Sequence, residues 1–224
     1  ANHLHGGICG FDKKLWDVVT YDGKSLTLGY CSPDGEEEYP GNLNVKITFA
    51  VDDRELKIHY HATTDKNCYV NLTHHPDIKS HLLKLYTNQF LKTNDLIPDG
   101  SFVLAEGDYD FTNPRALCHV IDNQGGLDDC FVFNQPGKMK RMAELASKET
   151  GIKMYVCSDY PGLQIYTGRY LNIQGAKKGR NYGPYAGVAL EAQYFPDSPN
   201  HLEFPSTLLK PGEEYSKNIV FGFE

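Results

Sequence analysis

The sequence predicts a mainly β protein with a single domain, built from short antiparallel strands. Three observations lead to this expectation. The chain has 15 tyrosines and 11 phenylalanines, which suit a pleated surface, and 21 glycines and 12 prolines, which mark turns. Apolar and polar residues alternate in several short segments. At 224 residues the chain can bury one sizeable core, whereas two independent domains would both be small. We therefore expect one domain over residues 1–224.

The clearest strand signal lies in the first third of the chain. Every second residue from 43 to 51 is apolar, which is the period of a strand with one buried face. The polar residues 52–54 predict a turn, and the alternation resumes over 56–60. After a second polar turn at 64–67, another strand is expected to begin at 69–72. This region is expected to form an antiparallel meander.

Further short strands are expected along the rest of the chain, and their spacing favours a β-sandwich. The apolar runs occupy 82–86, 153–157, 163–167, 188–193 and 219–223. Residues 138–148 are rich in good helix formers, but a turn-like segment, Lys148–Gly151, and a strand-like run follow them. We therefore interpret residues 138–148 as a strand.

The charge balance indicates which partners to expect. A formal net charge of -7 and a pI near 5.7 do not favour nucleic acid or an anionic membrane surface, which attract clustered Lys and Arg. No apolar run approaches the roughly 20 residues that span a bilayer, and Ala1–His3 does not resemble the start of a secretory signal. A neutral small molecule fits this composition better than either polymer or membrane.

The six cysteines are scattered without CxxC spacing in a chain large enough to hold a core without disulfides. Paired cysteines are typical of small secreted domains, and reduced thiols are typical of the cytosol. We therefore expect free thiols and a cytoplasmic protein.

Histidines are the first candidates for chemistry. His3 and His5 lie two apart beside Gly6 and Gly7, where a backbone without Cβ atoms can approach a ligand closely. The pair in 59–61 repeats this spacing on an expected strand, so both rings would share one face. No third ligand is evident, and paired strand histidines are more often ordinary polar-face residues, so we predict no metal site.

Two other positions carry polar groups in unusual surroundings. His74 and His75 follow a strand-like run, where loops commonly present catalytic groups. Glu191 is the one carboxylate in the mostly apolar segment 187–195, which is compatible with a buried functional group or with a glutamate on the solvent face. Asp128 and its neighbour Asp129 follow a Gly-Gly pair and are compatible with a solvated turn.

Several motifs resemble those of aldose 1-epimerases. Residues 2–13 read NHLHGGICGFDK, with Trp16 beyond them, and resemble the family's N-x-LHGG-xx-GFDK-xx-W. Other segments resemble family motifs in the family's order: NLTHH (71–75), IPDG (97–100), GLDD (126–129), PGLQIYTG (161–168), LEAQYFPDSPN (190–200) and LKPGEEY (209–215). A set of motifs in the correct order is far less frequent by chance than a single motif.

The resemblance implies an antiparallel β-sandwich of the galactose mutarotase type and an isomerase that interconverts the α and β anomers of a free hexose such as galactose or glucose. By motif position, Glu191 matches the family's general base and His75 its general acid. His5, Asp128 and Gln164 match residues that bind the sugar. A carboxylate and an imidazole together perform acid/base ring opening, so no metal or cofactor is expected.

The sequence departs from the family pattern at three places. The family has strands and a sugar-contacting arginine upstream of its LHGG motif, so we expect a sandwich that lacks these N-terminal strands. The segment 76–81 after His75 differs from the family's longer aromatic run. Asp129 replaces a histidine of the family, and like-charge repulsion with Asp128 is expected to raise the pKa of one of the two carboxyls.

Two alternatives remain open at this point. One is a non-catalytic carbohydrate-binding protein on the same fold. The other is a sugar-phosphate epimerase-like enzyme, for which Arg169 and Arg180 are the candidate phosphate ligands. The pattern also leaves open which aldose is preferred and whether the protein is a monomer or a homodimer.

Overall fold

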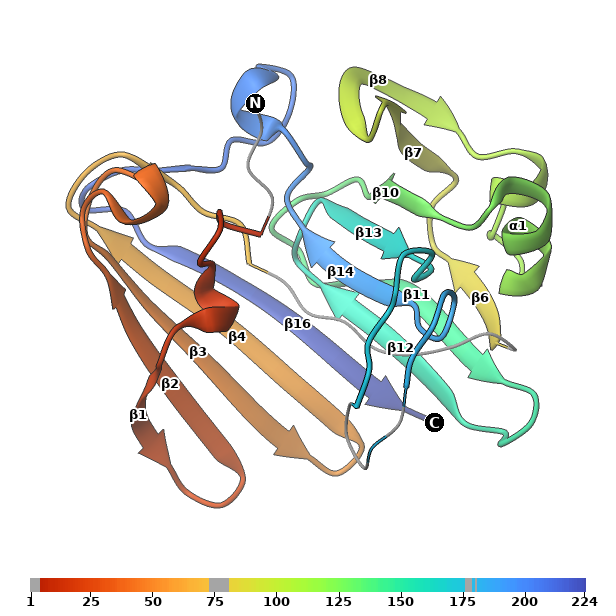
Figure 1. The fold of residues 1–224 in the computed structure, drawn as a ribbon, viewed down its shortest axis with the longest axis horizontal. Helices are drawn as coiled ribbons and strands as arrows, with labels where there is room; N and C mark the ends of the chain where they lie inside the picture. The colour runs from red at the N-terminus through yellow and green to blue at the C-terminus, as the bar shows by residue number, and fades with distance from the viewer. Residues whose placement is uncertain (1–4, 73–80, 176–178, 180) are drawn as a thin grey trace. The chain divides into compact units, whose positions relative to one another are not determined.

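The computed structural model describes residues 5–72, 81–175, 179 and 181–224, which form two compact units. The first unit comprises Ala1–Asn71 and Thr207–Asn218, and the second comprises Leu72–Ser206 and Ile219–Glu224. Both are built mainly from antiparallel strands, which confirms the predicted fold class (Figure 1).

The first unit contains a sheet in the order β1-β2-β3-β4. Its elements are η1 (Phe11–Lys13), β1 (Asp17–Tyr21), β2 (Ser25–Ser32), η2 (Glu36–Glu38), β3 (Leu43–Asp52), β4 (Glu55–Thr64), β5 (Cys68–Tyr69), β15 (Leu208–Leu209) and the start of β16 (Tyr215–Phe223). The alternating runs predicted from the sequence are β3 and β4, joined by a turn at Asp53–Arg54. Val45 of β3 lies opposite Ala62 of β4, and both are buried, as the period of two requires.

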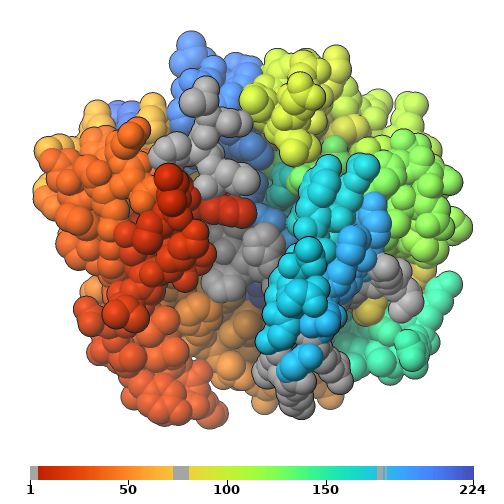
Figure 2. Space-filling view, in the orientation of Figure 1, coloured from red at the N-terminus to blue at the C-terminus, as the bar shows by residue number. Residues whose placement is uncertain are grey.

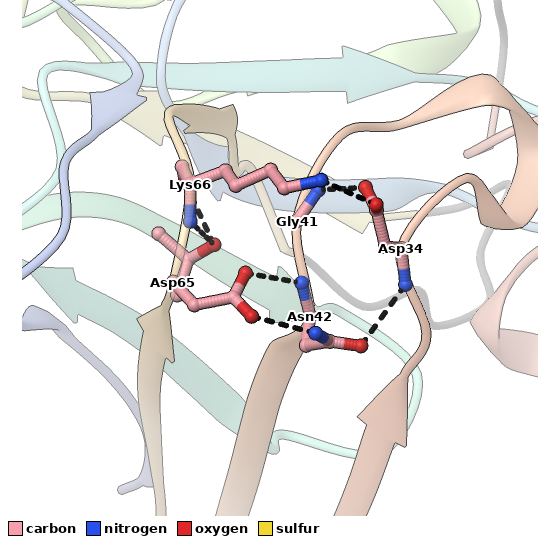
Figure 3. A network of polar contacts seen from close by, with 6 residues as sticks. Asp34, Gly41, Asn42, Asp65 and Lys66 are labelled. Atoms are coloured by element: carbon pink, nitrogen blue, oxygen red, sulfur yellow. Dashed lines mark hydrogen bonds and ion pairs between the residues drawn. The ribbon is translucent and has the colours of Figure 1, made fainter.

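The strand expected over 69–72 is wrong in length and partner. Only Cys68 and Tyr69 form a strand, β5, and it pairs with β15 rather than extending the β3–β4 sheet. The edge of β4 beside which the chain was expected to reverse is occupied by β16. In the preceding turn, the carboxylate of Asp65 accepts hydrogen bonds from the backbone and side-chain amides of Asn42, at 2.7 and 2.6 Å, which tie the turn to the β2–β3 connection (Figure 3).

The second unit contains two antiparallel sheets, in the orders β16-β12-β11-β6-β9 and β14-β13-β10-β7-β8. Its strands are β6 (His81–Leu85), β7 (Gln89–Asn94), β8 (Ile97–Leu104), β9 (Arg115–Ala116), β10 (Asp128–Val132), β11 (Lys140–Ser147), β12 (Lys153–Ser158), β13 (Gly162–Tyr166), β14 (Ala189–Gln193) and the end of β16. The short helices are η3 (Gly107–Tyr109), α1 (Leu117–Gln124) and η5 (Ser198–Asn200). The later apolar runs and the 138–148 segment are confirmed as strands.

The two sheets of the second unit share one core. Phe111 is fully buried and links them: its carbonyl accepts the N–H of Leu85 on β6, and its ring packs edge-on against Phe131 of β10 at 6.4 Å. Leu85 and Phe131 are themselves fully buried. Aromatic side chains of this size contribute much of the hydrophobic stabilisation of a sandwich. The sheet that carries β10, β13 and β14 is therefore packed against a buried aromatic core.

Helix α1 was not expected from the sequence. Leu117 and Val120, three residues apart, are its buried residues. Gly125 ends the helix in a left-handed conformation, and the Gly125 and Gly126 amides donate to the carbonyls of Ile121 and Val120. The Gly-Gly pair was a usable stop signal for a short helix. In the part of the chain that the structure describes, no helix is long and apolar enough to cross a membrane.

Candidate functional site

Three neighbouring strands of the second unit bring Asp128, Gln164 and Glu191 together. Gln164 of β13 lies directly opposite Glu191 of β14 on one side and Cys130 of β10 on the other. Asp128 precedes Cys130 by two residues, so its side chain is on the same face of the sheet. We call these three polar residues the Asp128–Gln164–Glu191 row. The strands that carry it are labelled in Figure 1.

The middle residue of the row has one filled and one unfilled hydrogen-bonding position. Nε2 of Gln164 donates to Oδ1 of Asp128 at 2.8 Å, which fixes the orientation of the amide. Oε1 of Gln164 is buried and has no hydrogen-bond partner among the residues that the structure describes. A buried acceptor without a donor costs about 1–3 kcal/mol. A ligand hydroxyl that donates to this oxygen would recover that cost.

The carboxyls of the row have altered acidities. Burial raises the pKa of Glu191 to about 7, and the charge of Asp128 adds to the effect. Burial also raises the pKa of Asp128, while the hydrogen bond from Gln164 opposes the rise. A carboxyl with a pKa near 7 exchanges protons readily near neutral pH, as general acid/base catalysis requires. Glu191 is half-buried, so it is not a fully solvated glutamate.

Asp129 is half-buried on the opposite face of β10, directly across from Ile165. Its pKa is raised to about 6, mainly by burial; the Asp128 N–H donates to its carboxylate and opposes the rise, and the charge of Asp128 makes a smaller contribution. The repulsion expected from the sequence is therefore present but secondary to desolvation. The solvated-turn interpretation of the two aspartates is wrong, because both belong to β10.

Asp129→Asn is expected to stabilise the protein at pH 8 by on the order of 2 kcal/mol. The folded-state pKa lies above the ordinary value of 3.8, so the folded protein loses stability as pH rises from about 4 to about 6 and the loss remains above that range. Asparagine cannot ionise and still accepts the Asp128 N–H. Urea unfolding at pH 8 and pH 4 measures the gain, which should vanish at pH 4. An equal gain at both values would contradict the role of ionisation.

Two buried residues that sequence analysis did not identify, Cys130 and Gly162, pack tightly beside the Asp128–Gln164–Glu191 row. Cys130 is 2% exposed, and burial raises the pKa of its thiol, which therefore stays protonated. A Cβ atom at Gly162 would lie 2.9 Å from both Sγ of Cys130 and the ring of Phe195. The glycine of the PGLQ motif therefore allows Cys130 and Phe195 to pack closely against β13. The detectable signal was the period of two, which places residue 130 on the face of residue 128.

The remaining sequence candidates are placed as follows. His5 is exposed and belongs to the first unit. His75 lies outside the described residues, as does its neighbour His74. Nε2 of His59 is 3.0 Å from Oγ of Ser216, and Nε2 of His61 is 3.7 Å from a carboxylate oxygen of Glu214. Within the described ranges, no three His, Cys, Asp or Glu side chains are grouped as metal ligands would be.

Arg169, a candidate phosphate ligand, is exposed and contacts the ring of Tyr170. Its guanidinium lies 5.7 Å from the centre of the Tyr170 ring, and both residues are exposed. The Tyr170 N–H donates to the hydroxyl of Tyr166, the last residue of β13. The segment that follows β13, cyan to light blue in Figure 2, lies on the surface of the second unit. Arg180 lies outside the described residues.

Comparison with known proteins connects this arrangement with an enzyme family. A profile described as aldose 1-epimerase matches residues 1–222. The chain is 32% identical to an aldose 1-epimerase of Escherichia coli (strain K12) over 244 residues, which cover 100% of this chain and 70% of that protein. It is 37% identical to a galactose mutarotase of Mus musculus over 241 residues, which cover 99% of this chain and 69% of that protein.

Solved structures agree in fold. An aldose epimerase homologue from C. elegans matches with a TM-score of 0.91 and 25% identity, covering 99% of this chain and 72% of that one. A galactose 1-epimerase from Lactobacillus acidophilus matches with a TM-score of 0.84 and 24% identity, over 99% of this chain and 70% of that one. The predicted sandwich type is thereby confirmed.

Proposed function

Since the chain belongs to the aldose 1-epimerase family, we propose that it interconverts the α and β anomers of a free hexose such as galactose or glucose by opening and reclosing the sugar ring. The observation that carries the proposal is Glu191, a half-buried carboxyl with a pKa near 7, in one row with an unfilled hydrogen-bond acceptor. The reaction requires both proton transfer and the recognition of sugar hydroxyls.

In the proposed reaction, ionised Glu191 takes the proton from the C1 hydroxyl. His75 gives a proton to the ring oxygen, so the C1–O5 bond breaks and an aldehyde forms. Rotation about the C1–C2 bond presents either face of the aldehyde to the C5 hydroxyl. Return of both protons closes the ring as the other anomer. Only protons move and nothing is oxidised or reduced, so the reaction requires neither a metal nor a nicotinamide.

The other residues are proposed to hold the sugar. Oε1 of Gln164 would accept one hydroxyl proton, and the carboxylate of Asp128 would accept another while keeping its bond to Nε2 of Gln164. His5 is assigned to substrate binding by its position in the LHGG motif. A site that hydrogen-bonds a substrate hydroxyl discriminates strongly against an analogue that lacks it.

The activity and its pH dependence test the proposal. Polarimetry of freshly dissolved α-galactose or α-glucose should show anomer exchange faster than in buffer alone. Because the base must be ionised, kcat/KM should fall about tenfold per pH unit below about 7, the pKa of Glu191. A protein that binds the sugar without speeding exchange would instead be a carbohydrate-binding module. A profile that stays flat down to pH 5 would remove Glu191 as the base.

We also propose a cytoplasmic location, because the six cysteines are free thiols. The expected partner is a neutral small molecule, in keeping with a formal net charge of -7. Whether the protein acts as a monomer or as a homodimer is measured by light scattering.

A further inference from the structure

The turn that contains His5 has an unfavourable backbone conformation. His5, Gly6 and Gly7 all have positive φ, at 57, 77 and 100°. Glycine adopts such values freely, but histidine does so at a cost. This segment, red in Figure 2, lies on the surface of the first unit, and two contacts within that unit enclose it.

A carboxylate 29 positions downstream supplies one of these contacts. The Ile8 N–H donates to Oε2 of Glu37 at 2.8 Å. A Cβ atom at Gly7 would come within 2.2 Å of the same oxygen, so the carboxylate lies directly against this glycine. A Cβ atom at Gly10 would likewise come within 2.2 Å of the His5 carbonyl oxygen. The turn is therefore enclosed between Glu37 and the backbone of Gly10.

Glu37 is itself held in place by the loop that carries it. We call Pro33–Asn42, the connection between β2 and β3, the Glu37 loop. Its two ends are joined because the Gly41 N–H donates to Oδ1 of Asp34 at 2.7 Å and the Asp34 N–H donates to Oδ1 of Asn42 at 3.1 Å. Lys66 pairs with the same Asp34 carboxylate, which ties the base of the loop to the turn after β4 (Figure 3).

The neighbouring glutamate, Glu36, contacts the same N-terminal segment further along, at Lys14. Glu36 accepts hydrogen bonds from Lys14, Tyr30 and Ser32, at 2.7, 2.8 and 2.7 Å. Burial alone would raise its pKa, but these donors together lower it, so Glu36 is ionised at neutral pH. Two adjacent glutamates thus hold the segment that runs from His5 to Lys14 at two points, Glu37 at Ile8 and Glu36 at Lys14.

We propose that Glu37 is a positioning residue for His5, because its carboxylate holds the His5–Ile8 turn in the conformation that presents the imidazole to a sugar hydroxyl. This inference rests on the proposed function in one respect, the assignment of His5 to substrate binding. Since Glu37 acts on binding rather than on proton transfer, its loss should raise KM and leave kcat nearly unchanged.

The matched variants are Glu37→Ala and Glu38→Ala. Both residues have positive φ, at 48 and 70°, so alanine meets similar backbone strain at each, but only Glu37 bonds to Ile8. Glu37→Ala should make the Ile8 amide exchange with solvent at least about tenfold faster by NMR and raise KM about tenfold, with kcat within about twofold. Glu37→Gln keeps an acceptor and should recover part of both losses. Glu38→Ala should behave as the wild type.

A double-mutant cycle separates positioning from general structural damage. His5→Ala should raise KM by itself, and adding Glu37→Ala should raise it no further, because the residue that Glu37 positions is already lost. Fully additive losses, or a Glu37→Ala variant with the wild-type KM while His5→Ala has a raised one, would overturn the inference alone. An unchanged KM in His5→Ala would overturn the sugar-binding role assigned to His5 and the inference with it.

Discussion

Glu191→Gln is expected to lower kcat by at least about 100-fold, the lower bound for loss of a general base. Glutamine nearly preserves the shape of the side chain but cannot take a proton from the C1 hydroxyl. The loss should not reflect unfolding. The folded-state pKa of about 7 lies above the ordinary value of 4.5, so the folded protein loses stability as pH rises from about 4.5 to about 7, and glutamine removes this loss at higher pH. Polarimetry measures the rate, and urea unfolding at pH 8 measures the stability.

The matched control for this variant is Glu106→Gln in the same unit. Glu106 is exposed and precedes η3 without a side-chain capping bond. The same change of chemistry there should leave kcat and stability within about twofold and about 0.5 kcal/mol of the wild type. Glu191→Gln with wild-type turnover would remove the central residue of the proposed mechanism.

The second large effect is expected at His75. His75→Asn should reduce kcat by about 100-fold or more, since the ring oxygen then lacks its proton donor. An imidazole has an unperturbed pKa near 6.5, so it gives up and recovers a proton readily at neutral pH. The assignment follows from NLTHH at residues 71–75, where His75 aligns with the histidine of the family's NLTNH.

His74→Asn is the control for His75, and it restores the residue that the family has at that position. Its kcat should stay within a few fold of the wild type. The comparison is sharp because the two variants make the same substitution at adjacent positions. Equal losses, or a larger loss in His74→Asn, would mean that the motif is misaligned and that His74 is the acid.

Local pattern was sufficient to predict part of this structure. The strands β3 and β4 followed from strict alternation, because a sheet with one buried face imposes a period of two. Glu191 stood out because a single carboxylate in an apolar strand needs a reason to be there. The strand inference used only neighbours in the sequence and is confirmed by β3 and β4. The neighbours of Glu191 left its role open, and its assignment as the base came from the family motif.

The features that were missed depend on partners far apart in the chain. The short strand β5 pairs with β15, about 140 residues later, and no local signal specifies that partner. The unfilled oxygen of Gln164 follows from its bond to Asp128, 36 residues away. The acidity of Asp129 was expected to respond to its neighbour's charge, but burial is the larger effect and is set by the fold.

The contact between Gly7 and Glu37 also constrains how this protein can diverge. The carboxylate of Glu37 occupies the volume that a side chain at position 7 would otherwise fill. A larger residue at position 7 requires a shorter one at position 37, and the shorter residue would give up the bond to Ile8. Substitutions at the two positions are therefore expected to be energetically coupled, although 30 residues separate them.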